Sequence, residues 1–543
     1  MTVALGLCFA GSVQAQSTSG SISGTVAVGE GTTIVISNNS GFRRTVSSDA
    51  SGRYSVGSFP IGDYTVAVQR NGETVGAKDV TVIVGRTADV SFTGGGATML
   101  GTVSVTAASV PAIDVTAVDT RSIVTAEQLE RLPIQRSAEA IALLAPGANV
   151  GAGGFFGSSV SFGGAGVSEN AYYINGYFSG EPLSNIGGFS MPYNSIAQQE
   201  TYTGGYSAQY GRSDGGVINQ IGKSGSNEVH FGGQATWTPK KGRSDQRDIY
   251  YPNLDFAKAN ANPNIPINPD TGTPYQYVYG DPDSAGALYS RDSHDEEWSH
   301  SMTGYASGPL IRDRLFVYVS GEAEEVSTNL TPVEGGTSST HNIRSKPKIY
   351  AKLNWNINDS NLLEYSYMYS DNHRKGRLYE YDFDTGTEGV QLANAYPTEI
   401  RRRSEFSIFK YTGYLTDSLT LNATYGRANF LNQDLVYSLP GQAYLFGTPN
   451  QNPAITGGNP IRNDLKGYRG RNGRDYTDGL RADLEWLVGD HTLTAGVDNL
   501  KTEASNEGNA QINPAWQYSK AAGNIVPALG VGSPVSATNP DGY

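Results

Sequence analysis

From residue 228 onward the chain alternates between apolar and polar residues. Apolar side chains occupy every second position over Val229–Trp237, Ile349–Ile357 and Leu480–Val488. Period-two alternation is typical of a β-strand with one apolar and one polar face. It predicts nine strands, near residues 228–237, 299–308, 314–325, 347–358, 361–371, 404–416, 418–430, 478–488 and 491–503.

The connections between these strands alternate between long and short. The long ones cover residues 238–298, 326–346, 372–403 and 431–477, and tight turns are predicted at 311–313, 359–360, 417 and 489–490. Long loops on one side and short turns on the other are typical of an outer-membrane β-barrel. Tryptophans are predicted at both rims, as aromatic girdles require: Trp237, Trp298, Trp355 and Trp486. The strands of a soluble β-sandwich or propeller also alternate between apolar and polar residues. Their connections, however, rarely differ so strongly in length between the two ends of the strands.

The N-terminal part predicts a separate small domain. Residues 19–93 form short alternating segments divided by Gly, Asn and Asp turns, which is the pattern of a β-sandwich. Its stretch SSDASGRYSVGSFPIGDYTVAV resembles the carboxypeptidase-regulatory-like domain, an immunoglobulin-like sandwich, through Asp49, Gly52, Tyr54, Pro60, Gly62 and Tyr64. A fold does not by itself define a function. We therefore expect no specific activity from this domain, only a role as a spacer or docking module.

Two short helices are predicted between the sandwich and the strands. Thr125 and Gln128 form a capping box before the first, and the second runs from Ser137 to Leu144, where Pro146-Gly147 ends it. The preceding segment MLGTVSVTAASV is an extended stretch, and residues 151–190 are predicted to be a glycine-rich loop surface.

Composition narrows the class further. The 543 residues carry a net charge of −13, so no basic footprint for nucleic acid exists. The only cysteine, Cys8, lies in an apolar run that ends at Val13-Gln14-Ala15, which predicts a secretory signal over residues 1–15. Its positively charged n-region is missing, so we expect the true start to lie upstream. No later run of 18 or more apolar residues exists, and a membrane would have to be crossed by strands.

Two motifs suggest catalysis. Gly211-Arg212-Ser213-Asp214-Gly215 fits the pattern of a serine hydrolase, but a predicted strand follows where a nucleophile elbow requires a helix. Gly222-Lys223-Ser224 fits the end of a phosphate-binding loop, but Val217 stands where the first glycine belongs. We predict turns at both places, with glycine permitting close backbone approach.

Metal sites are not predicted either. His294 and His300 are six residues apart rather than the four of a helical zinc motif, and Asp382, Asp384 and Glu388 do not have the spacing of a calcium loop. No catalytic, metal or cofactor site is therefore predicted.

Three stretches together carry a family resemblance: VTAEQLERLPIQRSAEAIALLAPGANV (124–150), GGAGVSENAYYINGYFSG (163–180) and the glycine-rich residues 200–233. With the order of the parts, they make the chain resemble a TonB-dependent outer-membrane receptor of the Oar-like group. The family usually has Asp-Gly where this chain has Asn175-Gly176. Gly163 replaces an arginine of many siderophore receptors, which lowers the expectation of an iron-chelate ligand.

The resemblance implies a mainly β fold with an N-terminal immunoglobulin-like sandwich, an α+β plug and a transmembrane β-barrel. The boundaries expected are a signal over 1–15, the sandwich over 16–95, a linker over 96–110, the plug over 111–226 and the barrel over 227–543. Family barrels have 22 strands around a plugged lumen. Nine strands would form an open sheet around part of the plug, so we expect a C-terminally truncated barrel whose first and last strands do not pair.

The implied function is import of a ligand, without enzymatic activity, in the outer membrane of a Gram-negative-type cell, with the plug and the sandwich on the periplasmic side. The expected partners are outer-membrane lipid, a TonB-type energy-transducing protein of the inner membrane, and an imported peptide, oligosaccharide or chelate. The TonB box is predicted at Thr102, Val103, Ser104, Val105, Thr106 and Ala107, where an extended segment can add to a partner's sheet.

Ligand contact, if it follows the family, is expected from the outward loops of the plug, through aromatic and apolar side chains: Phe155, Phe156, Tyr172, Tyr177, Phe178, Phe189, Met191 and Tyr193. Packing against the barrel wall is the equally weighted alternative for them. A non-transporting adhesin and, more remotely, an exported hydrolase that uses Ser213 remain as alternative functions.

Overall fold

The protein is described by a computed structural model that covers residues 18–27, 32–92, 103–105, 119–151, 159–187, 189–206, 210–241, 244–251, 286–392, 399–435, 444–447, 468–469, 472–488, 491–505, 510–511 and 515–518. The predicted signal segment and five predicted site residues lie outside these ranges: Thr102, Thr106, Ala107, Phe155 and Phe156.

The N-terminal domain is a β-sandwich of two sheets. One sheet has the order β4-β1-β7 and the other β3-β2-β5-β6-β8. The strands are β1 (Ser19–Thr25), β2 (Thr32–Asn38), β3 (Arg43–Val46), β4 (Arg53–Pro60), β5 (Gly62–Arg70), β6 (Glu73–Val82), β7 (Thr87–Asp89) and β8 (Val103–Val105). The inward residues of both sheets, such as Ile22, Ile34 and Val66, are fully buried.

The plug is built around a five-stranded sheet of order β13-β12-β15-β14-β9. These strands are β9 (Thr120–Thr125), β12 (Ala171–Ile174), β13 (Tyr177–Phe178), β14 (Ile196–Gly204) and β15 (Val217–Gly222); the pair β10 (Ala148–Val150) and β11 (Val160–Phe162) and the 3-10 turns η1 (Val167–Glu169) and η2 (Tyr193–Ser195) complete it. Both predicted helices are present, as α1 (Ala126–Arg131), with the Thr125–Gln128 capping box, and α2 (Ala138–Ala142), capped by Ser137.

The prediction of a loop surface over residues 151–190 was wrong where it covers β11, β12 and β13. Every residue of β12 is buried, because this strand lies between β13 and β15 inside the plug. A strand that is buried on both faces shows no alternation of apolar and polar residues. Its four residues therefore gave no periodic signal.

The long strands that follow the plug form one large antiparallel sheet, whose main path has the order β16-β19-β20-β21-β22-β24-β25-β28-β29. The bounds are β16 (His230–Thr238), β19 (Glu296–Ile311), β20 (Leu315–Leu330), β21 (Ser338–Asn358), β22 (Asn361–Asp382), β24 (Glu399–Tyr414), β25 (Leu419–Leu435), β28 (Asn472–Val488) and β29 (His491–Glu503). All the predicted strands are confirmed. The outermost strands, β16 and β29, do not pair with each other in the part of the chain that the structure describes.

Several strands are longer than the alternation predicted. β21 and β22 pair through Ser338↔Glu380 and Arg344↔Arg374, in stretches that were predicted to be loops. The strands continue there because backbone pairing does not require an apolar face once a sheet has left lipid. Short accessory strands lie at this loop end: β17 (Ile249–Tyr250), β18 (Leu288–Ser290), β23 (Thr387–Gln391), β26 (Tyr444–Gly447), β27 (Tyr468–Arg469), β30 (Ala510–Gln511) and β31 (Ala515–Tyr518), with the 3-10 turn η5 (Asp292–His294) before β19.

The outward face of the large sheet is apolar and exposed. Phe231, Met302 and Val497 are each more than 60% exposed, as lipid-facing positions of a barrel wall are. Trp355 and Trp486 lie opposite the strand starts Leu315 and Leu419 at the short-turn end, and Trp237 lies near the other end of β16. Among the described residues, no helix has the length and apolar character needed to cross a membrane.

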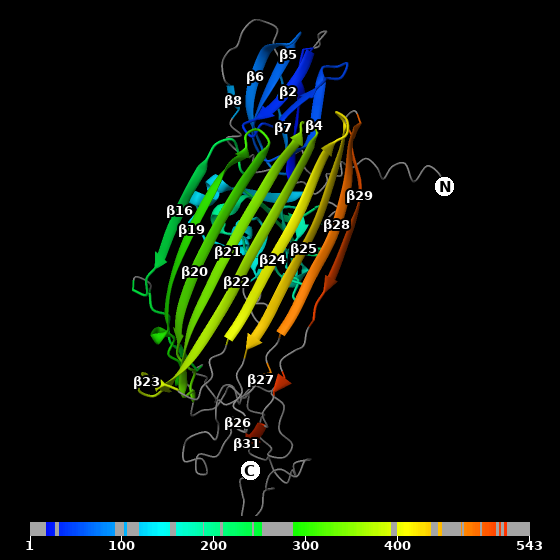
Figure 1. Ribbon diagram of the computed structural model, residues 1–543. Helices are drawn as coiled ribbons and strands as arrows, with labels where there is room; N and C mark the ends of the chain where they lie inside the picture. Colours follow the sequence, from blue (N-terminus) through cyan, green and yellow to red (C-terminus); the bar gives the residue numbers. More distant parts are fainter. Residues whose placement is uncertain are drawn as a thin grey trace, which may run out of the picture.

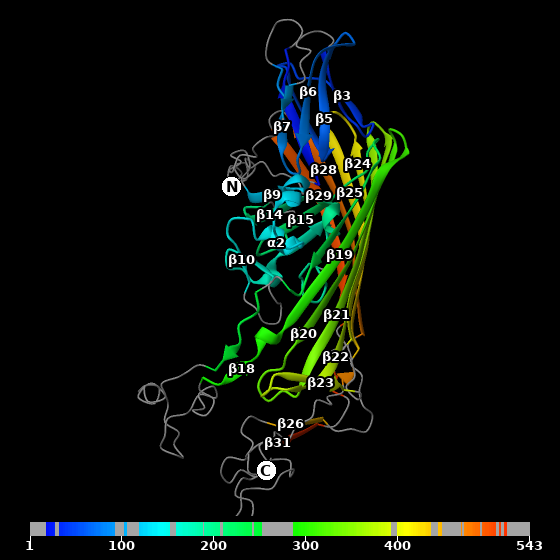
Figure 2. The ribbon, with the colours of Figure 1, turned by 90° about the vertical axis from the view of Figure 1, so that its left-hand side faces the viewer.

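Figures 1 and 2 show how the three parts are arranged. The plug lies against one face of the curved sheet, and the sandwich caps the end of the sheet where the short turns are. The short accessory strands β18, β23, β26 and β31 lie toward the opposite end. The lumen face of the sheet is thus covered by the plug near the sandwich and is open toward the loops.

Candidate ligand cavity and periplasmic face

A cavity of about 1490 Å³ separates the plug from the loop half of the barrel wall. On the plug side it is lined by residues 135–139 and by residues between 181 and 190, and on the barrel side by lumen-facing residues of β16 and β19 to β25. Binding pockets for small molecules are usually about 300–1,000 Å³. This cavity is therefore larger than a usual small-molecule pocket.

Ion pairs line one wall of the cavity. Lys348 Nζ lies 2.7 Å from Glu322 Oε1, and Lys346 Nζ lies 2.9 Å from Glu324 Oε1, each across the β20–β21 pair. The second oxygen of Glu322 accepts a hydrogen bond of 3.1 Å from the backbone N–H of Tyr193. Both carboxylates are therefore paired with a lysine. Glu322 also joins the plug to the barrel wall through its hydrogen bond with Tyr193.

The predicted ligand-contacting residues that the structure describes are distributed unevenly. Phe189 lines the cavity and packs edge-on against Phe406 of β24 at 5.6 Å. The others are buried in packing contacts within the plug or between the plug and the wall: Tyr172, Tyr177, Phe178, Met191 and Tyr193. Only Phe189 among them faces the cavity.

Sequence reasoning missed the charged lining of the cavity, which includes Arg136, Arg344, Arg374 and Arg402. The last three lie on strand extensions beyond the apolar alternation. A signal was present, because Asn342, Arg344, Lys346 and Lys348 are polar at every second position. Extending the period through polar stretches would have placed them on the lumen face.

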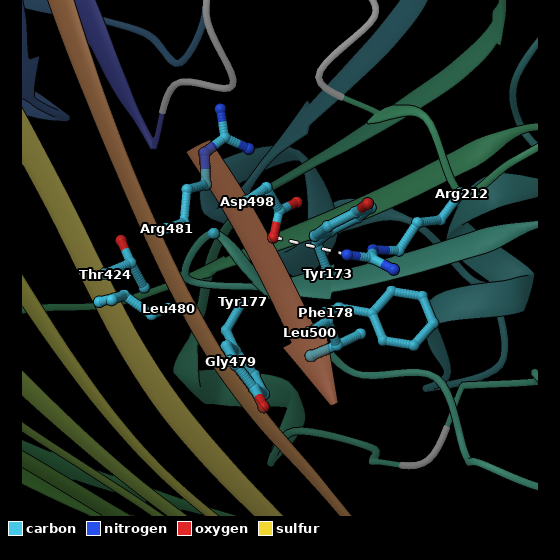
Figure 3. A pocket seen from close by; sticks show the side chains of 11 residues that line it. Tyr173, Tyr177, Phe178, Arg212, Thr424, Gly479, Leu480, Arg481, Asp498 and Leu500 are labelled. Carbon is cyan, nitrogen blue, oxygen red and sulfur yellow. Dashed lines mark ion pairs between the residues drawn. The ribbon is translucent and has the colours of Figure 1, made fainter. Parts of the chain in front are cut away.

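Figure 3 shows a second, much smaller cavity at the seam between the plug and β28 and β29. Its volume is about 20 Å³, enough for a single water molecule. Arg212 of the plug lies 3.5 Å from Asp498 of β29 there, and the Tyr177 hydroxyl is 2.9 Å from Thr477 Oγ1 of β28. This seam holds the plug and does not provide a ligand site.

Asn175 ties the plug to the wall at the position where the family usually has aspartate. Its φ of 49° is in the left-handed region, which asparagine tolerates better than most residues. The side-chain amide donates to Ser366 Oγ at 3.0 Å and Tyr350 Oη at 3.3 Å, and its carbonyl oxygen accepts from the Gly222 N–H at 2.9 Å. An ionised aspartate could not donate to these two hydroxyls.

Glycine permits close packing at the join between plug and barrel. A side chain on Gly222 would collide with the Tyr350 hydroxyl, and one on Gly225 would lie 2.5 Å from the carbonyl oxygen of Val317. The strand β15 begins at Val217, as the alternation predicted. Ser213 Oγ lies 3.1 and 2.9 Å from the carbonyl oxygens of Glu169 and Gly216 and can donate its one hydrogen to either, which is a turn interaction.

The stretch that contains His294 and His300, which was considered as a metal motif, forms a turn and the start of a strand. The connection predicted over residues 238–298 extends into β19, because this strand begins at Glu296 rather than at residue 299, and Trp298 stacks on His300 with 5.6 Å between the ring centroids. No group of three metal-ligating side chains is found within the described ranges.

On the short-turn side, the sandwich docks on the barrel through an aromatic cluster. Tyr414, at the end of β24, is 6% exposed and lies 6.0 Å from Phe42 and 6.3 Å from Phe59, measured between ring centroids. Its hydroxyl donates to the carbonyl oxygen of Ser58 at 2.9 Å, and the Arg44 guanidinium lies 4.0 Å above its ring. The core of the sandwich is therefore continuous with the barrel end.

The sandwich also contacts the plug, at a buried ion pair. Arg121 Nη1 lies 3.6 Å from Glu200 Oε1, and Gly85 of the sandwich is so close to this pair that a side chain there would collide with Arg121. Glu200 accepts hydrogen bonds from Asn219 at 2.8 Å and Tyr202 at 3.0 Å. These partners favour its ionised form, but complete burial outweighs them and raises the pKa of Glu200 to about 7.

The part of the predicted TonB box that the structure describes is the strand β8. It pairs in parallel with β6 of the sandwich, in the register Lys78↔Val103, Asp79↔Ser104 and Val80↔Val105. It is the last strand in the order of its sheet. The segment thus lies at a sheet edge, between the sandwich and the plug in the chain.

Comparisons with known proteins agree with this geometry. A family model described as the TonB-dependent receptor plug domain matches residues 114–218, and one described as the carboxypeptidase regulatory-like domain matches residues 19–94. Residues 114–218 thus match the plug domain of TonB-dependent receptors, and the large antiparallel sheet lies against them.

Within this class the chain is similar to the TonB-dependent transporter Oar of Myxococcus xanthus, with 31% identity over 206 residues, which are 36% of this chain and 19% of that protein. The chain thus spans about a fifth of the length of this relative and about half of the solved structures it matches. These include the outer membrane transporter YddB from Escherichia coli (14% identity, 71% of this chain and 48% of that chain, TM-score 0.46) and a mutant of the ferric enterobactin receptor PfeA from Pseudomonas aeruginosa (16%, 72% and 49%, TM-score 0.46). The matches lend no support to an adhesin.

Proposed function

We propose that this protein imports a ligand across the outer membrane by energy-coupled movement of its plug, without enzymatic activity. The ligand, a peptide, an oligosaccharide or a chelate, enters the cavity from the loop side and contacts Phe189. A TonB-type protein of the inner membrane binds the box at residues 102–107 and pulls on the plug. In this proposal residues 16–95, 96–110, 111–226 and 227–543 are the sandwich, linker, plug and barrel parts.

The observation that carries the proposal is the pairing of β8. Three residues of the box already add to a sheet edge through backbone bonds, and this is the mode by which an extended segment would bind a partner's sheet. The box precedes the plug directly in the chain, so a force on it would be transmitted to the plug.

Proline substitution tests the coupling. In Val103→Pro and Val105→Pro variants a backbone donor is lost and strand addition is blocked. We expect uptake to fall to the level of cells without the protein, while ligand binding to the cell surface is retained. Uptake and binding would be followed with labelled peptide and labelled oligosaccharide mixtures.

Val103→Ala and Val105→Ala are the matched controls, because they shorten the same side chains but keep the N–H groups. Both should retain most of the uptake. Undiminished uptake in both proline variants would exclude residues 102–107 as the box.

A further inference from the structure

Two arginines lie directly opposite each other on neighbouring strands of the barrel wall. Arg344 of β21 and Arg374 of β22 are cross-strand partners, and both line the large cavity. Their strands place them on the lumen face, since Tyr350 and Met368, an even number of residues away, are fully buried against the plug. Like charges directly opposite each other destabilise a sheet, so this arrangement needs an explanation.

Neighbouring lysines in the same wall have carboxylates within ion-pair distance, whereas in the part of the chain that the structure describes these two arginines do not; Asp434 attracts Arg374 only from beyond that distance and is itself paired with Arg402. Lys346 and Lys348 have carboxylate partners at 2.9 and 2.7 Å. Within the described ranges neither Arg344 nor Arg374 makes an ion pair or a hydrogen bond through its side chain. Packing against the plug does not explain these two arginines either, because both side chains are partly exposed to the cavity.

A third arginine extends the cluster. Arg402 of β24 lines the cavity and pairs with Asn372, two residues before Arg374. Its Nη1 lies 2.6 Å from Asp434 Oδ1 and donates to the carbonyl oxygen of Gln433 at 2.9 Å, which leaves the rest of its guanidinium to the cavity. Three neighbouring strands thus contribute one cation each.

The cavity also has carboxylates. Asp371 lies on β22 itself, where it accepts a hydrogen bond of 2.9 Å from Arg401 Nε, and Glu322 and Glu324 of β20 are paired with lysines. Glu139 and Glu181 belong to the plug and Glu297 to β19. Glu181 is engaged by Asn432 Nδ2 at 2.7 Å and by Ser184 Oγ at 2.6 Å. The carboxylates of β20 and β22 are thus engaged by other cations, and Arg344 and Arg374 are the part of this wall that has no such partner within the described ranges.

We propose that Arg344, Arg374 and Arg402 form a binding site for anionic groups, carboxylate or phosphate, of the imported ligand. An anion between the arginines would remove their repulsion and accept paired N–H bonds from planar guanidinium groups. This inference deepens the proposed function and rests on it, because it assigns the chemistry of the transported ligand.

The test uses the purified protein in detergent and three fluorescein-labelled tetrapeptides: tetraglutamate, tetraphosphoserine and neutral tetraglutamine. We expect the two anionic peptides to bind at least tenfold more tightly than tetraglutamine. The Arg344→Gln/Arg374→Gln double variant should lose at least tenfold in affinity for them. The tighter of the two anionic peptides then assigns carboxylate or phosphate.

Arg377→Gln is the matched control, since Arg377 is an exposed residue of the same strand outside the cavity. It should bind the anionic peptides like the wild type. Thermal unfolding distinguishes binding from a structural role: without peptide, the double variant should unfold at the wild-type temperature or higher, because repulsion is removed. A lower unfolding temperature, or equal affinity for all three peptides, would overturn the proposal.

The two proposals fail separately. The Val103→Pro variant should bind tetraglutamate like the wild type, because the box lies outside the cavity. If the double variant imports and binds ligand normally, the anion site is wrong and import stands. If wild type and Val103→Pro import equally, the coupling proposal is wrong whatever the anion affinity.

Discussion

Docking of the sandwich on the barrel should depend on Tyr414. Replacement by alanine removes a buried ring between Phe42 and Phe59, the contact with Arg44 and the hydrogen bond to Ser58. Loss of a buried aromatic side chain costs about 3–5 kcal/mol. The docked fraction should therefore fall by about a hundredfold or more relative to the undocked one, since 1.4 kcal/mol corresponds to about tenfold.

Hydrogen–deuterium exchange of the sandwich and limited proteolysis between the sandwich and the plug would measure this change. Tyr414→Phe keeps the ring and loses only the hydrogen bond, at about 1 kcal/mol, so its effect should be several-fold. Tyr425→Ala is the matched control, because Tyr425 is 42% exposed on the neighbouring strand. Wild-type protection in Tyr414→Ala would refute the view that this cluster holds the sandwich.

Two further predictions concern the plug. Ser213→Ala should leave ligand uptake unchanged and remove no hydrolytic activity toward ester substrates, because the hydroxyl serves a turn; loss of a hydrolytic activity would revive the enzyme alternative. The raised pKa of Glu200 means that the folded state binds its proton more tightly than the unfolded state, whose value is 4.5. The free energy of unfolding should therefore fall as pH rises from about 4.5 to about 7, by up to about 3 kcal/mol, and Glu200→Gln should flatten this dependence in thermal unfolding measured from pH 4 to 8. An unchanged pH profile in the variant would contradict the assignment.

The barrel strands could be predicted because lipid on one side and a wet lumen on the other impose period two on every strand. That signal stops where a strand leaves the membrane, so the positions of Arg344 and Arg374 were assigned to loops. The plug strand β12 was missed for the opposite reason, since burial on both faces erases the period. Helix α1 was predictable because its cap is local: Thr125 and Gln128 are three residues apart.

The docking site of the sandwich could not be predicted, because it depends on contacts between residues more than three hundred positions apart. Ser58 and Tyr414 are an example. Neither residue has a distinguishing local pattern. The alternating segments that predict the sandwich do not indicate which of its surfaces contacts the barrel. Only the three-dimensional arrangement brings the turn ends of the barrel to the sandwich.

This arrangement sets the order in which contacts would yield if the box is pulled. β8 is held to β6 by three residue pairs. At about 0.5–1.5 kcal/mol for each hydrogen bond, three bonds amount to about 1.5–4.5 kcal/mol, which lies mostly below the value for the Tyr414 cluster alone, about 3–5 kcal/mol. We therefore expect β8 to detach first while the sandwich stays docked. Amide exchange measured with and without the periplasmic domain of the TonB-type partner would show this as a loss of protection along the β6 edge, at Lys78 to Val80, with Tyr64 and Val66 in the core unchanged. Simultaneous loss at both places would mean that the sandwich itself unfolds under the pull, and would refute detachment of β8 alone.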